Sequence, residues 1–218
     1  MVKLSTRNIH SGDEDIVSSH VDDGTPRCCS CERLKPRGTT YYKLDDGRKL
    51  CQECIESIIN TDHGRRSICL EVQNFYKKLN VKVEKIPVRL VGRQVIIDAM
   101  KEGNDDSDRQ LPVIRAVGLF EKSLTSAFMG RPSQLCYEVK EILIWYGLPR
   151  ILTGSLLAQQ MMRAWLRLNS LNCCPNMSPE VEKGICGYFA HRWLEYSSSS
   201  YSSKKLSEFE EKLCRKRN

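Results

Sequence analysis

The sequence contains no apolar run that approaches the roughly 18 residues of a membrane-spanning helix, which excludes an integral membrane protein. Its first 24 residues also lack the apolar core of a secretory signal, because acidic and histidine residues interrupt them. No segment is a dedicated basic arm, although the net charge is +7, so a nucleic-acid partner is permitted rather than implied. We therefore expect a protein of the cytosol, or of the nucleus, that does not enter a membrane.

The composition is that of a globular chain. Its 218 residues are 40% hydrophobic and 28% charged, and this length is enough for a small module followed by a larger domain. We expect four parts: a disordered tail over residues 1–24, a cysteine-bearing module over 25–62, a larger domain over 66–196, and a Ser-rich linker with a basic tail over 197–218.

Two close CxxC units stand out among the 11 cysteines. In a secreted chain so many cysteines would suggest disulfides, but in a cytosolic one this spacing indicates a metal site. The units are Cys28-x-x-Cys31 and Cys51-x-x-Cys54, with 19 residues between them. A hairpin in that interval would return the second pair to the first, so that four thiolates bind one structural Zn²⁺. A closed set of four ligands leaves no position for water, and we expect it to hold the fold without performing chemistry.

The identity of the first ligand is open, because Cys29 adjoins Cys28. The CxxC spacing favours Cys28. Four thiolates on one Zn²⁺ carry a net charge of −2, and the module is rich in arginine and lysine residues that would offset it.

The remaining chain alternates between helix and strand patterns. Apolar residues recur at helical spacing over 67–79, and β-branched residues over 81–91 predict a strand that Pro87 places at an edge or a bulge. Further on, the sequence predicts a helix at 95–100, a polar loop at 103–109, a buried strand at 137–146, a helix from 150 or 155 to 169, a loop at 172–179, and a helix that starts at Ser178-Pro179 and ends near Tyr196.

Several motifs carry a family resemblance. They are PRCCSCER at 26–33, LDDGRKLC at 44–51, VQNFY at 72–76, GLPRILTGS at 147–155, EKGIC at 182–186 and AHRWLE at 190–195. The first two resemble the last half of a LIM-type zinc domain. Together the motifs resemble the plant ubiquitin-receptor peptidases that limit seed and organ size, the DA-one family. The resemblance implies an α+β fold, in which a half-LIM module precedes a zincin-like peptidase domain with a small sheet and helices.

In that family the helix after Gly154 carries HExxH, in which two histidines bind Zn²⁺ and the glutamate activates water. The matching positions here are Gln159, Gln160 and Arg163. An arginine cannot ligate a cation, and its charge repels one. We interpret the three residues mostly as the polar face of an amphipathic helix, and we expect no peptidase activity.

The family's third metal ligand comes from the next helix. That region reads Glu182-Lys183. The analogy with the family's helix favours Lys183 over Glu182 as the ligand position. Even if Glu182 is the matching residue, one carboxylate alone would not make a zinc site. Cys186 and His191 do not form a nucleophile pair, because residues five apart point about 140° from each other around a helix. The resemblance also predicts a truncated member, without ubiquitin-binding helices or upstream LIM cysteines. Val17 stands where a zinc cysteine is expected, so His20 is an orphan ligand.

These observations favour a non-catalytic, zinc-stabilised pseudopeptidase. It would act as a scaffold or competitor that binds active family members, ubiquitin ligases or their substrates, with ubiquitin as a further candidate partner. The alternatives are a zinc peptidase with residual activity, a nucleic-acid-binding zinc finger, and a decaying gene copy without function.

Overall fold

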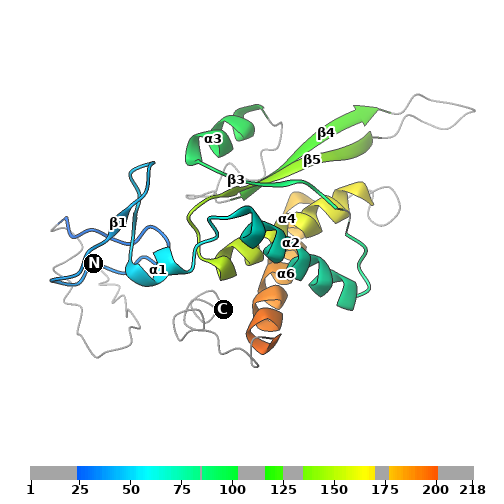
Figure 1. Ribbon diagram of the computed structural model, residues 1–218. Helices are drawn as coiled ribbons and strands as arrows, with labels where there is room; N and C mark the ends of the chain where they lie inside the picture. The colour runs from blue at the N-terminus through cyan, green and yellow to red at the C-terminus, as the bar shows by residue number, and fades with distance from the viewer. Residues whose placement is uncertain (1–23, 84, 103–115, 125–134, 170–176, 201–218) are drawn as a thin grey trace, which may run out of the picture. The chain divides into compact units, whose positions relative to one another are not determined.

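The computed structural model describes residues 24–83, 85–102, 116–124, 135–169 and 177–200 (Figure 1). The chain divides into two compact units, Met1–Gln52 and Glu53–Asn218. It is built of helices and two small sheets, so the predicted α+β class is confirmed. Within the described ranges, no helix combines the length and the apolar character that crossing a membrane requires.

The first unit contains a two-stranded antiparallel hairpin. Strand β1 (Tyr42–Lys43) pairs with β2 (Lys49–Leu50). The turn between them depends on Gly47, whose φ of 84° is favourable only for glycine. The predicted hairpin between the two CxxC units is therefore present.

The second unit begins with helices. The short helix α1 (Gln52–Glu56) lies at the junction of the units, and α2 (Asp62–Lys78) follows. Helix α2 starts five residues before the predicted 67, because the Thr61 side chain caps it by accepting a hydrogen bond from the Gly64 N–H at 3.0 Å.

A three-stranded sheet with the order β3-β5-β4 follows. Strand β3 (Val88–Val91) pairs in parallel with β5 (Leu135–Trp145), and β4 (Ala116–Leu124) pairs with β5 in the antiparallel sense. The predicted strand at 81–91 is shorter than expected. Pro87 has no N–H to donate, so pairing is regular only after it, and β3 is an edge strand as its position predicts. Strand β4 was not predicted from the sequence.

Helix α3 (Arg93–Glu102) connects β3 to the chain beyond residue 102 and confirms the predicted helix at 95–100 with wider bounds. Helix α4 (Arg150–Leu168) packs against the sheet, and α2 and α6 (Pro179–Ser200) pack on α4. Of the two predicted starts of α4, residues 150 and 155, the structure confirms 150. The predicted loop at 103–109 and most of the loop at 172–179 lie outside the described residues.

The predicted end of the last helix at Tyr196 is wrong, because α6 continues through Ser200 into the segment assigned as a linker. Ser197 is buried there, and the Ser198 hydroxyl donates to the Leu194 carbonyl at 2.9 Å. Serine hydroxyls can donate hydrogen bonds to carbonyls of their own helix, so a run of serines can continue a helix and need not form a linker. The predicted domain boundaries themselves stay predictions.

Candidate metal centre and the polar centre between α4 and α6

The first CxxC unit forms a tight turn. The Cys28 N–H donates to the Arg33 carbonyl at 2.8 Å, and the Glu32 N–H donates to the Cys28 carbonyl at 2.9 Å. Glu32 takes a φ of 65°, a left-handed conformation that closes the turn. The short bridge between Arg27 and Leu34 fixes the two arms that enter and leave it. Local backbone bonds thus orient this end of the site.

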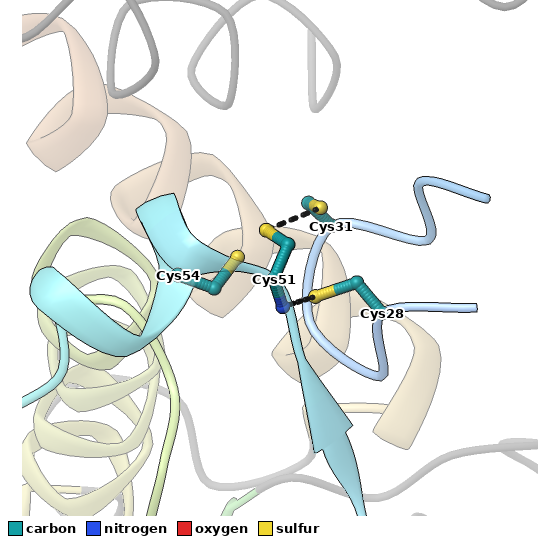
Figure 2. A group of neighbouring side chains, drawn as sticks. All are labelled: Cys28, Cys31, Cys51 and Cys54. Carbon is teal, nitrogen blue, oxygen red and sulfur yellow. Dashed lines mark hydrogen bonds between the residues drawn. The ribbon is translucent and has the colours of Figure 1, made fainter. Parts of the chain in front are cut away.

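The second CxxC unit lies at the end of β2. Cys51 follows the strand directly, and Cys54 lies in α1 one turn later. The Cys51 N–H donates to Cys28 Sγ at 3.4 Å, which links this unit to the first (Figure 2). An N–H directed at a sulfur favours its thiolate form, which is the form that binds metal.

The four cysteines converge on one point. Their sulfur atoms all lie within 4.8 Å of one another, and Cys31 Sγ is 3.7 Å from Cys51 Sγ (Figure 2). Tetrahedral Zn²⁺ with bonds of about 2.3 Å separates its sulfurs by about 3.8 Å. The donor set and its spacing therefore fit a zinc-type site, and the cluster could hold a metal ion.

Cys29 lies outside this group and is only partly buried. Its N–H donates to the Lys49 carbonyl at 2.9 Å, and burial raises the pKa of its thiol, which disfavours the thiolate. The geometry thus favours Cys28 over Cys29, the choice that the sequence left open. Val17 and His20 lie outside the described residues.

Tyr41 lies beside the cluster. Its hydroxyl donates to the Arg33 carbonyl at 3.0 Å. Burial, with a further contribution from the nearby cysteines, raises the pKa of Tyr41 well above its usual value. The phenol therefore stays neutral and serves as a donor that holds the first turn in place.

A second polar centre lies between α4 and α6. Arg163 of α4 is buried, with 3% of its side chain exposed, and its Nε lies 3.0 Å from Oε1 of Glu182 on α6. Arg167, one turn further along α4, approaches the same oxygen at 3.1 Å through a terminal guanidinium nitrogen. Its guanidinium also lies 4.3 Å from the centroid of the Phe120 ring on β4. One carboxylate therefore joins two guanidiniums across the helix interface.

Arg167 was missed by the sequence analysis, although its position four residues after Arg163 places both on one face of α4. The preference for Lys183 is not supported by the geometry. The Lys183 side chain is exposed, and Glu182 is the residue directed at Arg163.

The interpretation of Gln159, Gln160 and Arg163 as mostly the polar face of an amphipathic helix is wrong, because such a face would be exposed to solvent. Gln160 and Arg163 are buried, and Gln159 is half-buried. Gln160 donates to the Ala116 carbonyl of β4 at 3.5 Å, a long contact. Helix α4 is central, covered by the sheet and two helices, so even its polar positions are removed from water.

Cys186 and His191 both lie in α6 but differ in burial. Cys186 is buried, and burial raises the pKa of its thiol to about 12. His191 is more exposed and lies 3.4 Å from Glu195 on its own helix. The buried thiol is therefore protonated at neutral pH, which disfavours a role as a nucleophile.

Comparison with known proteins supplies the family. The family model described as DA1-like: Protein DA1 matches residues 78–216. Protein DA1-related 1 of Arabidopsis thaliana is 46% identical over 206 residues, which cover 86% of this chain and 36% of that protein. Protein DA1 of the same plant is 41% identical over 228 residues, covering 89% of this chain and 42% of the relative.

A third relative, LIM domain-containing protein HDR3 of Oryza sativa subsp. japonica, is 37% identical over 194 residues, which cover 81% of this chain and 38% of the relative. The chain thus spans well under half the length of these proteins. No solved structure matches. The family model and the identities agree with the motifs and with the cysteine cluster: this chain belongs to the DA1-like family.

Proposed function

We propose that this chain is a zinc-binding pseudopeptidase, a scaffold or competitor that binds the polypeptide partners of its active relatives without cleaving them. The observation that carries the proposal is the ion pair between Arg163 and Glu182. By resemblance, Arg163 stands where α4 would supply a metal ligand, and Glu182 is the carboxylate of α6 that faces it.

The chemistry of this pair opposes a catalytic ion. A guanidinium stays protonated at any physiological pH and has no lone pair to offer. Its Nε lies 3.0 Å from Oε1 of Glu182, so this carboxylate is already engaged. Gln160 stands in the position of the general base, and an amide cannot accept a proton from water at neutral pH. These points support a centre without hydrolytic chemistry.

The cysteine cluster is proposed to bind one structural Zn²⁺. Cys28, Cys31, Cys51 and Cys54 supply four thiolates, and a tetrahedral ion has no fifth position for water. We propose that this ion stabilises a half-LIM module, since a module of this size buries too little apolar surface to fold alone.

Partner binding is proposed for the sheet beside α4. Among the described strands, β4 pairs only with β5, so its other edge can accept an extended peptide through backbone hydrogen bonds. Such pairing needs neither a metal nor a general base. It is compatible with partners of the kind bound by peptidases, and we propose active family members, ubiquitin ligases or their substrates in the control of plant growth.

The test is a paired binding and cleavage assay. The purified chain is incubated with an active relative and that relative's substrate, and capture and proteolysis are measured together. We expect capture of one of them above a scrambled-sequence control, with the substrate intact when the active relative is omitted. Failure to capture either one contradicts the scaffold, and chelator-sensitive cleavage by this chain alone contradicts the absence of activity.

A further inference from the structure

Helix α6 carries an exposed face that nothing in the described chain covers. Val181 and Tyr188 are 53% and 58% exposed, although both are large and apolar in part. They are seven residues apart, two turns along one side of the helix. Between them lie Gly184, which is exposed, and Ile185, which is partly buried. The positions i, i+3, i+4 and i+7 are the four corners of a hole into which a side chain from another helix can insert.

Gly184 leaves this hole without a side chain at one corner. Apart from its chain neighbours and the backbone of its own helix, a Cβ at Gly184 would meet no described atom within 4 Å, and the same holds for Gly187. A glycine inside a helix costs about 0.5–1 kcal/mol relative to alanine, and two of them lie here in adjacent turns. By contrast, packing explains the glycine at position 154 of α4, because the Trp193 ring occupies the space that a side chain there would fill. The open space at Gly184 thus lacks an occupant from within the described chain.

The same face supplies a side chain of suitable shape. Tyr188 projects from the face, four residues beyond Gly184. In an antiparallel pair of α6 helices related by a twofold axis near Cys186, Tyr188 of each copy lies opposite Gly184 of the other. A twofold interface requires one surface that is complementary to itself, and a projection and a hole four residues apart meet this condition.

The charges of Glu180 and Arg192, on either side of the hole, favour the antiparallel arrangement. Glu180 lies in the first turn of α6, before the hole, and Arg192 lies beyond Tyr188; both are exposed. Arg192 also pairs with Glu195 on its own helix at 2.6 Å. Antiparallel packing about an axis near Cys186 brings Glu180 of one copy opposite Arg192 of the other, and it aligns the helix dipoles favourably. A parallel arrangement would bring like charges together.

We propose that the α6 face formed by Val181, Gly184, Ile185 and Tyr188 is the interface of an antiparallel, twofold-symmetric dimer of this chain. One helix face is small beside the roughly 1,200–2,000 Å² that stable interfaces bury, so the dimer dissociates in the micromolar range. The proposal is independent of the pseudopeptidase assignment.

The test is sedimentation velocity of the full zinc-loaded chain over a concentration series, under reducing conditions that prevent disulfide cross-links. We expect a concentration-dependent dimer. Gly184→Leu fills the hole, and Tyr188→Asp removes the projection and adds charge; each should weaken association at least tenfold. Leu70→Asp on α2 is the matched control, since Leu70 is equally exposed, at 59%, on another helix.

Folding of each variant is checked by its melting temperature. Gly184→Leu should melt no lower than the parent, because its side chain enters open space. Glu180→Arg should weaken the dimer, and Glu180→Arg with Arg192→Glu should restore it. A chain that is monomeric at every concentration overturns the proposal, as does a dimer that survives both Gly184→Leu and Tyr188→Asp. Capture of a different protein through this face by a monomeric chain also overturns it.

Discussion

A methyl group on Gly154 would lie 2.1 Å from Cη2 of Trp193, so the indole ring of α6 occupies the space above this glycine of α4. Both residues are buried, and their contact sets how closely the two helices approach. This spacing in turn brings Glu182 within hydrogen-bonding distance of Arg163 and Arg167.

Gly154→Ala should therefore destabilise the chain. A helical alanine gains up to about 1 kcal/mol over glycine, but overpacking a buried site commonly costs about 1–3 kcal/mol, and here the added methyl group would clash with a buried ring. We expect a lower urea midpoint. Gly187→Ala is the matched control, since nothing in the described chain lies within 4 Å of its Cβ position, and it should raise the midpoint. Equal gains from both variants would contradict the packing described here.

The two members of the buried ion pair should differ in their effect on stability. Glu182→Gln leaves the buried Arg163 without its carboxylate, and breaking a buried pair in this way costs about 3–5 kcal/mol. Arg163→Met leaves Glu182 still paired with Arg167 at 3.1 Å, so it should cost less. The free energy of unfolding of each variant measures this asymmetry. Glu195→Gln, which breaks an exposed pair, should change it by under about 1 kcal/mol.

Cys28 and Cys29 should behave differently when each is replaced. Cys28→Ser removes a sulfur of the cluster and should lose the bound zinc, whereas Cys29→Ser should keep one zinc per chain. Metal analysis of the two purified variants distinguishes them. Loss of zinc from Cys29→Ser but not from Cys28→Ser would mean that Cys29, and not Cys28, binds the metal.

Restoring the family motif should create a second metal site. The triple substitution Gln159→His, Gln160→Glu and Arg163→His supplies two imidazoles near Glu182, and we expect zinc content to rise from one to two per chain. Adding Glu182→Gln should return it to one. A triple variant that folds but still binds a single zinc would contradict the equivalence of α4 with the family's catalytic helix.

The cysteine cluster could be predicted because its geometry is local. Two CxxC turns and an intervening hairpin depend on near neighbours, which the sequence displays directly. Helix α2 was predictable for a similar reason: Ile68, Val72 and Phe75 recur at helical spacing, and all three are buried. The choice between Cys28 and Cys29 needed the structure, since it depends on which sulfur faces Cys51.

The polar centre could not be predicted, because its partners are distant in sequence. When only their own helix is considered, Arg163 and Gln160 resemble exposed positions. In the fold they are buried, because Glu182, 19 residues after Arg163, pairs with Arg163 and a carbonyl of β4 accepts a hydrogen bond from Gln160. Strand β4 was missed since Gly118 and charged residues interrupt its apolar pattern. Its pairing with β5 is what establishes it as a strand.

The most direct test of the account is the zinc content of the purified full chain, measured together with its hydrolysis of a polypeptide substrate. We predict one zinc per chain, no zinc in Cys51→Ser, and no hydrolysis. Two zinc ions per chain, of which one survives in Cys51→Ser, together with hydrolysis that a chelator stops, would contradict it.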